Sequence, residues 1–170
     1  MSKNIVLTGF MGAGKTEVGR ILARRLGYAL VDVDDEIEKE QGMKISDIFS
    51  RFGEPAFRDI ESAMINRLSQ GASMVISTGG GAVLRQENID RLRSKGVIVC
   101  LTASAETIFR RTKRNNDRPL LKVEDPLGKI KELLASRQHC YEKADMSVDT
   151  EEKTPSEVAG EIIERVAKRA

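Results

Sequence analysis

Five short apolar runs divide the sequence into alternating segments. They span residues 4–8, 28–33, 73–77, 97–102 and 146–148. Stretches with apolar residues at helical spacing follow these runs, and they cover residues 15–26, 35–71 with breaks near Gly42 and Gly53, 86–95, 105–114, 126–141 and the segment that Pro155 opens. Strands that alternate with helices are typical of a parallel sheet covered on both faces. The pattern therefore predicts a three-layer α/β fold.

Chemically distinctive residues follow the first three apolar runs. A glycine-rich loop follows the first run, carboxylates follow the second, and Thr78-Gly79-Gly80-Gly81 follows the third. Parallel sheets of this kind bind ligands beyond the carboxyl ends of their strands. We therefore expect these three segments to meet in one site.

Residues 9–16, GFMGAGKT, match G-x-x-x-x-G-K-[ST] at every fixed position, between a predicted strand and a predicted helix. Glycines allow backbone N–H groups to surround phosphate oxygens, and the helix N-terminus favours negative charge. Lys15 is placed to bridge the β- and γ-phosphates, and the Thr16 hydroxyl to ligate Mg²⁺. The alternative is a chance glycine-rich turn, but such a turn need not lie between a strand and a helix. The motif therefore predicts binding of a nucleoside triphosphate.

The acidic residues separate a kinase from a switch or a motor. No N-K-x-D motif follows a later strand, as a GTPase would have, and the third apolar run ends in glycines rather than aspartate. Instead Asp32 and Asp34 follow the second run. On an extended chain they would share one side, about 6.6 Å apart, one holding a magnesium-bound water and the other facing a second substrate. The alternative is that Asp34, Asp35 and Glu36 only acidify the first turn of a helix.

Three arginines occur at positions that their surroundings do not explain. Arg137 falls on an apolar helical stripe, where a cation is unfavourable unless it meets an anion or extends to the surface. Arg58 precedes Glu61 by three residues, which predicts a partly buried ion pair or an ordinary surface pair. Arg118 lies in the polar stretch 115–125, which is typical of a lid that closes on a phosphate or of a plain surface loop.

Composition excludes several classes of protein. The formal net charge of +2, from 28 basic and 26 acidic residues, does not indicate a nucleic-acid partner. No apolar run approaches the roughly 18 residues of a membrane span, and the first strand begins too early for a signal peptide. Cys100 and Cys140 predict neither a disulfide framework nor a zinc site. We expect a cytoplasmic monomer with a single domain over residues 1–170.

The chain resembles the shikimate kinase family along nearly its whole length. The motifs GFMGAGKT, DVD, FRDIE, STGGGAV and RPLL, then Arg137 with Tyr141 and finally VDT, occur in this order and at these spacings. The resemblance implies a fold like that of nucleoside-monophosphate kinases, with a five-stranded parallel sheet in the order 2-3-1-4-5. It also implies transfer of the γ-phosphate of ATP, with Mg²⁺, to the 3-hydroxyl of shikimate.

The resemblance further implies roles on the acceptor side of the site. Asp34 would hydrogen-bond the shikimate hydroxyl and act as a base, and Arg58 and Arg137 would grip the carboxylate. Gly79, Gly80 and Gly81 would line the pocket. Helices within about residues 35–62 would bind this substrate, and a loop over about 113–125 would form the lid.

On the nucleotide side, the resemblance implies contacts from the phosphate loop and from two later segments. Lys15 and Arg118 would neutralise phosphate charge, Thr16 and Asp32 would hold Mg²⁺, and Arg111 and Pro155 would flank the adenine. The remaining expected nucleotide contacts are Gly12, Ala13, Gly14, Glu17 and Lys153.

One position departs from the family pattern, because Glu17 stands where family members usually have a second Ser or Thr. Its carboxylate adds negative charge near the α-phosphate, so weaker nucleotide affinity is expected. Gluconate kinase remains an alternative with the same fold and loop, followed by nucleoside-monophosphate kinases. A non-catalytic ATP-binding module is a further alternative, although Lys15, Asp32, Asp34 and Arg118 argue against it.

Overall fold

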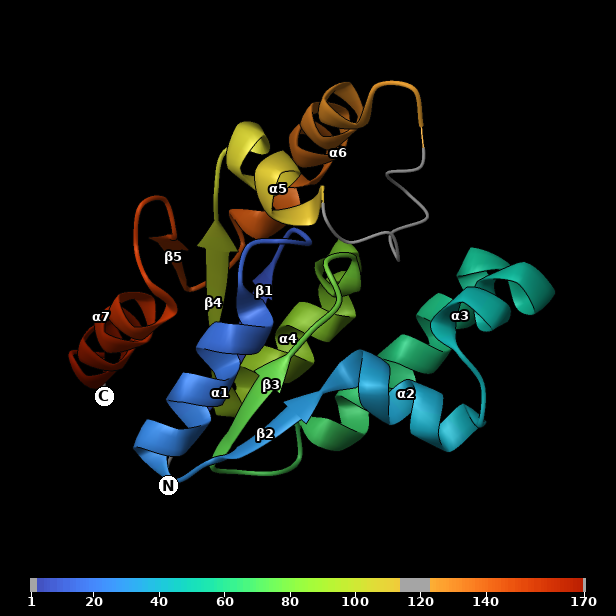
Figure 1. Cartoon of the computed structure of the whole chain (residues 1–170). Helices are drawn as coiled ribbons and strands as arrows, with labels where there is room; N and C mark the ends of the chain where they lie inside the picture. The colour runs from blue at the N-terminus through green and yellow to red at the C-terminus, as the bar shows by residue number, and fades with distance from the viewer. Residues whose placement is uncertain (1–2, 114–122, 170) are drawn as a thin grey trace.

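A computed structural model describes residues 3–113 and 123–169. Its five strands form one parallel sheet in the order β2-β3-β1-β4-β5 (Figure 1). The strands are β1 (Asn4–Gly9), β2 (Ala29–Asp32), β3 (Met74–Ser77), β4 (Gly96–Thr102) and β5 (Met146–Asp149). The predicted fold class and strand order are confirmed.

Helices connect successive strands and cover both faces of the sheet. They are α1 (Lys15–Leu26), α2 (Val33–Gln41), α3 (Ile45–Leu68), α4 (Gln86–Lys95), α5 (Ala105–Thr112), α6 (Pro126–Tyr141) and α7 (Pro155–Ala167), with a short 3₁₀ helix, η1 (Ala82–Leu84). Three predicted ranges, 15–26, 86–95 and 126–141, match α1, α4 and α6. The 3₁₀ helix was not predicted.

Helix α2 begins at Val33, two residues before its predicted start. The reason is Asp32, whose side chain caps the helix by accepting hydrogen bonds from the backbone N–H groups of Asp34 and Asp35, at 3.0 and 3.4 Å. Asp34 therefore lies in the first helical turn, and the extended spacing expected for Asp32 and Asp34 is wrong.

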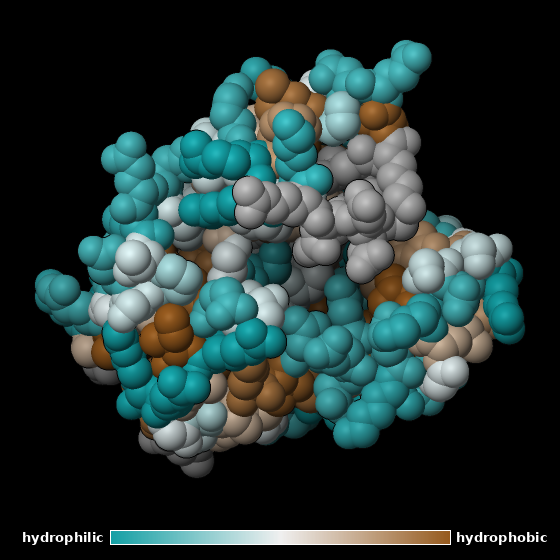
Figure 2. Space-filling view, viewed as in Figure 1, coloured by the Kyte–Doolittle hydropathy of each residue, from teal (hydrophilic) through white to brown (hydrophobic). Residues whose placement is uncertain are grey.

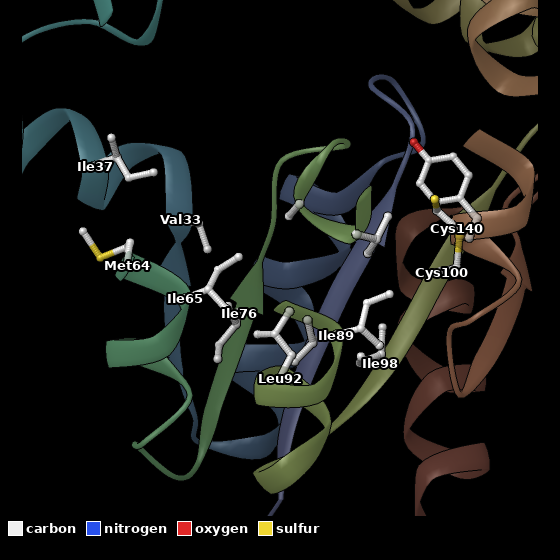
Figure 3. Close-up of a cluster of buried hydrophobic side chains, with 14 of the residues drawn as sticks. Val33, Ile37, Met64, Ile65, Ile76, Ile89, Leu92, Ile98, Cys100 and Cys140 are labelled. Carbon is white, nitrogen blue, oxygen red and sulfur yellow. The ribbon is translucent and has the colours of Figure 1, made fainter. Parts of the chain in front are cut away.

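Alternation along the strands builds two apolar layers. On one face, Ile5, Leu7 and Val99 pack with side chains of α1 and α7, and these helices lie together in Figure 1. On the other face, the core lies between the sheet and α2, α3 and α4 (Figure 3). The labelled side chains there include Ile37, Met64, Ile65, Ile76, Ile89, Leu92 and Ile98. Both faces are thus buried, as the continuous apolar strands predict.

Two features set the shape of the carboxyl edge of the sheet. Helices α5 and α6 enclose Phe10, which packs with Ile108 and Ile130. Helix α3 bends at Gly53, whose φ of 80° lies in the left-handed region, two residues before Pro55. The bend was predicted from the glycine, and it separates the start of α3 from the part that carries Arg58.

Polar side chains cover most of the visible face in Figure 2, and apolar surface is confined to small patches. The large apolar side chains that are exposed within the described residues are Leu30, Phe52, Leu84 and Val123. None of the helices in the described ranges combines the length and apolar character that crossing a bilayer requires.

The buried layer beneath α3 yields a stability prediction. Ile65 is fully buried, so Ile65→Ala should lower the free energy of unfolding by about 2–5 kcal/mol through lost burial and a residual cavity. Phe52 is 58% exposed, and Phe52→Ala serves as the control, with a loss of about 1 kcal/mol or less. Urea unfolding of both variants measures the difference, and equal losses would contradict this assignment of the core.

Candidate active site

The phosphate loop joins β1 to α1 in a conformation that only glycine tolerates at several positions. Gly9, Gly12 and Gly14 have φ values of 130°, 78° and 98°. A Cβ atom on Gly9 would clash with the Leu101 carbonyl oxygen of β4. Gly14 is the N-cap residue of α1, and Ala13 next to it is buried. The loop therefore places the N-terminus of α1 at the carboxyl edge of the sheet, where its backbone N–H groups can bind an anion.

Lys15 reaches back over this loop. Its Nζ donates hydrogen bonds to the carbonyl oxygens of Gly9 and Phe10, at 2.7 and 3.1 Å. Thr16 is exposed at the start of α1. Glu17 turns to the surface and pairs with Arg20 at 2.8 Å, so its carboxylate is partly neutralised by a neighbour on the same helix.

The Asp34 carboxyl lies near two acidic side chains and two basic side chains. Burial raises its pKa from 3.8 to about 6, and the charges of Asp32 and Glu61 add to the rise, while Lys15 and Arg58 oppose it. The Oδ1 atom of Asp34 is buried and has no hydrogen-bond partner among the described residues. A buried carboxylate oxygen in that state is suited to accept a hydrogen bond from a bound hydroxyl group.

Arg58 and Glu61 form the partly buried ion pair that their spacing suggested. The Nη1 atom of Arg58 lies 2.7 Å from Oε2 of Glu61, whose side chain is only 1% exposed. Burial raises the pKa of the Glu61 carboxyl, and the Arg58 guanidinium opposes that rise. Glu54 contacts the opposite side of the guanidinium at 3.1 Å. Together these contacts fix the orientation of Arg58.

The three glycines after β3 bring these groups together. A Cβ atom on Gly79 would lie 3.3 Å from Oδ1 of Asp34 and 3.4 Å from Oε1 of Glu61. A Cβ atom on Gly81 would clash with the Arg58 guanidinium. Charged side chains from α2 and α3 thus pack directly on the backbone of Gly79 and Gly81. This close packing explains why both positions are glycine.

Arg137 approaches the same glycines from α6. A Cβ atom on Gly80 would lie 3.4 Å from Nη1 of Arg137 and 3.5 Å from the Tyr141 hydroxyl, which donates to the Gly80 carbonyl at 3.1 Å. The Arg137 guanidinium also lies over the Phe10 ring, 5.9 Å from its centroid. Burial raises the pKa of the Tyr141 hydroxyl, and the Arg137 guanidinium opposes that larger effect. Arg137 on the apolar stripe therefore lies against Phe10, Tyr141 and the glycine backbone.

The segments expected near the adenine meet the phosphate loop through Arg111. Its guanidinium donates to the Gly12 carbonyl at 3.3 Å, and to the Thr150 hydroxyl and carbonyl at 3.0 Å each. Pro155 opens α7 close by in sequence. Lys153 instead pairs with Glu161 at 2.8 Å, which directs it along α7.

Arg118, and most of the expected lid over 113–125, lies outside the described residues. Sequence reasoning quoted Thr150 only within the VDT motif and gave it no role. Its hydroxyl accepts a hydrogen bond from Arg111 and donates one to the Thr102 carbonyl at the end of β4. The available signals were that motif and the position of this threonine just after a predicted strand.

Comparisons with known proteins identify relatives of this chain. A family model described as "Shikimate kinase" matches residues 11–167. A curated relative named shikimate kinase, from Thermodesulfovibrio yellowstonii, is 58% identical over 161 residues, covering 95% of this chain and 93% of the relative. "Shikimate kinase from Acinetobacter baumannii in complex with shikimate" has a TM-score of 0.93 at 38% identity, covering 99% of this chain and 95% of that one. The shikimate kinase from Aquifex aeolicus has a TM-score of 0.85 at 38% identity, covering 98% and 97%.

The raised pKa of Asp34 predicts a stability change that depends on pH. Because the unfolded chain releases this proton at lower pH than the folded chain, ionised Asp34 destabilises the fold above about pH 6, and the effect vanishes below about pH 4. Asp34→Asn should therefore raise the free energy of unfolding by on the order of 1–3 kcal/mol near pH 8.

Urea unfolding at about pH 8 and pH 4, in metal-free buffer, measures this effect. Asp90→Asn on the exposed side of α4 is the control and should change stability by about 0.5 kcal/mol or less. If Asp34→Asn does not raise the free energy of unfolding at high pH, the prediction is wrong. The basic neighbours of Asp34 would then compensate for the cost of burying its charge.

Proposed function

Because the chain belongs to the shikimate kinase family, we propose that it transfers the γ-phosphate of ATP to the 3-hydroxyl of shikimate, giving shikimate 3-phosphate and ADP. The observation that supports this acceptor best is the arrangement around Gly79–Gly81. Arg58, Arg137 and Asp34 converge there from three different helices, so two cations and one base surround a single bare stretch of backbone.

The two arginines suit a carboxylate, and Asp34 suits a hydroxyl. Guanidinium groups bind carboxylates through two parallel hydrogen bonds. Glu61 contacts Nη1 of Arg58 and Glu54 contacts Nε and Nη2, and since each Nη atom carries two N–H groups, one on each would remain for a ligand. The Asp34 carboxyl, with a pKa of about 6, is mostly ionised at neutral pH and can accept the hydroxyl proton as the new bond to phosphorus forms. Shikimate carries both functional groups.

Phosphoryl transfer itself depends on charge neutralisation and in-line positioning. Lys15, now hydrogen-bonded to loop carbonyls, would turn to the β- and γ-phosphates, and the backbone N–H groups of Gly12, Ala13, Gly14 and Thr16 would surround the phosphate oxygens. Arg118 would approach the transferring group as part of a lid.

Thr16 and Asp32 fit a magnesium site. Both present oxygen ligands, which Mg²⁺ prefers, and only Oδ1 of Asp32 is engaged in capping α2. Mg²⁺ supplies charge neutralisation at the phosphate oxygens. Asp32 would act through a metal-bound water, because its side chain is already hydrogen-bonded to the first turn of α2, which carries Asp34.

The remaining expectations follow from the same assignment. Residues 1–170 would form one kinase domain, with acceptor-binding helices within about 35–62 and a lid within about 113–125, working as a monomer in the cytoplasm. Arg111 and Pro155 would flank the adenine, the Glu17 backbone N–H would reach the α-phosphate, and Lys153 would be a further contact to ATP. Gluconate kinase is not favoured, since the relatives at high identity are shikimate kinases.

A screen of acceptors tests the proposed reaction. ADP release should be fast with shikimate and at least about 100-fold slower with gluconate, quinate and nucleoside monophosphates, because a missing or misplaced group leaves buried polar atoms unpaired. Phosphorus NMR of the product identifies the esterified hydroxyl. Lys15→Ala is the inactive control, and a better rate with gluconate would overturn the assignment.

Arg137→Lys tests the carboxylate grip. Lysine keeps the charge but cannot form two parallel hydrogen bonds, so the KM for shikimate should rise at least about tenfold while the KM for ATP changes less than about twofold. Arg110→Lys on the exposed surface of α5 is the matched control. If the KM for ATP rises instead, Arg137 belongs to the nucleotide site.

Substitution of each aspartate separates their roles. Asp34→Asn cannot accept a proton, so kcat should fall on the order of 100-fold or more at every Mg²⁺ concentration. Asp32→Asn retains an oxygen that can cap α2 but weakens the metal contact, so it should need more Mg²⁺ for half-maximal rate. Magnesium titrations at saturating ATP and shikimate measure both, and rescue of Asp34→Asn alone by excess Mg²⁺ would reverse the two roles.

A further inference from the structure

The turn between β5 and α7, residues 150–153, lies at the carboxyl edge of the sheet and is held by polar contacts. The Thr150 N–H and hydroxyl both donate to the Thr102 carbonyl at the end of β4, at 2.9 and 3.0 Å. The Glu151 N–H donates to Oδ1 of Asp149 at 2.9 Å. Glu152 has a φ of 52°, a left-handed conformation that costs energy for a residue with a side chain. Its neighbours must therefore hold the turn in this shape.

Glu151 joins this turn to helix α5. Its Oε1 atom accepts hydrogen bonds from the hydroxyls of Ser104 and Thr107, at 2.7 and 2.6 Å. Its Oε2 atom accepts from the Ser104 N–H at 3.4 Å. These hydrogen bonds lower the pKa of the Glu151 carboxyl, so the group is ionised at neutral pH and the contacts are of the strong, charge-assisted kind.

The partners of Glu151 belong to the start of the helix that carries Arg111. Ser104 is the N-cap residue of α5, and Thr107 lies in its first turn. Arg111 lies one turn further along, and it returns to Thr150 with two hydrogen bonds and to the Gly12 carbonyl with a third. The turn and the helix are thus joined at two points, by Glu151 at one and by Arg111 at the other, and the second point touches the phosphate loop.

We propose that Glu151 is a positioning residue for the nucleotide: by tying the β5–α7 turn to the N-terminus of α5, it holds Arg111 and the following Pro155 in place beside the phosphate loop. This inference rests on the proposed function, in that the phosphate loop binds ATP. Without the tie, the left-handed turn at Glu152 has less to oppose its relaxation, and Arg111 loses the fixed acceptors on Thr150. The cost then appears in nucleotide binding rather than in acceptor binding, because Asp34, Arg58 and Arg137 lie on other elements.

Calorimetric titration of the full chain with ADP measures nucleotide affinity in the absence of an acceptor, and steady-state kinetics with shikimate measure the acceptor side. Glu151→Ala should raise the dissociation constant for ADP about tenfold, with the KM for shikimate and kcat at saturating ATP within about twofold of the wild-type values. Glu151→Gln keeps Oε1 as an acceptor and should recover most of the affinity. Glu152→Ala is the matched control and should bind ADP normally. It keeps the left-handed position but removes a side chain that makes no hydrogen bond or ion pair with the described residues.

A second variant guards against a folding defect. Thr107→Val keeps the shape of the side chain but removes the hydroxyl that donates to Glu151, so it should weaken ADP binding in the same direction, and combination with Glu151→Ala should add little. Unchanged ADP affinity in Glu151→Ala, or equal losses of ADP and shikimate affinity, would overturn the inference. A wild-type protein that binds ADP but does not phosphorylate shikimate would refute the proposed function and leave this inference intact.

Discussion

The bare backbone of Gly79–Gly81 is the constraint on which the site depends. Charged side chains from three helices pack into the space that side chains on Gly79, Gly80 and Gly81 would occupy. They are Asp34 from α2, Arg58 and Glu61 from α3, and Arg137 from α6. The sheet places the glycines at the carboxyl end of β3, next to the phosphate loop after β1, because β1 and β3 are neighbours. An acceptor held against the glycines would therefore lie beside the γ-phosphate of a bound nucleotide, the arrangement that phosphoryl transfer requires.

The charges around the glycines are costly to bury, and their arrangement reflects the ligand that they are proposed to meet. A buried ion pair such as Arg58–Glu61 contributes little net stability, since desolvation cancels much of the attraction. Its value lies in orientation, because Glu61 fixes one edge of the Arg58 fork. Burial is the main cause of the raised pKa of Asp34, and the charges of Asp32 and then Glu61 add to it. Glu61 thus contacts the arginine that is proposed to bind the acceptor, and it also contributes to the raised pKa of the proposed base.

The sequence predicted the helices and strands well, because apolar periodicity depends only on residues that are close together along the chain. The apolar runs and helical stripes predicted most element boundaries within two residues. Arg137 on an apolar stripe predicted a contact with an anion, and in the structure this arginine lies against the Gly80 backbone. The sequence could not show that Asp32 would cap α2 and so move Asp34 into a helix, because capping competes with strand extension over single residues. Contacts between distant segments were equally hidden. Glu151 meets Ser104 and Thr107 only because β4 and β5 are adjacent.

The central claim is that the carboxylated acceptor binds on the glycine backbone between the two arginines. A crystal structure with shikimate and ADP tests it most directly. We expect the shikimate carboxylate within about 3.2 Å of guanidinium nitrogens of both Arg58 and Arg137, and the 3-hydroxyl within about 3.2 Å of an Asp34 carboxylate oxygen. A carboxylate bound away from both arginines, or a 3-hydroxyl that faces any group other than Asp34, would contradict the claim.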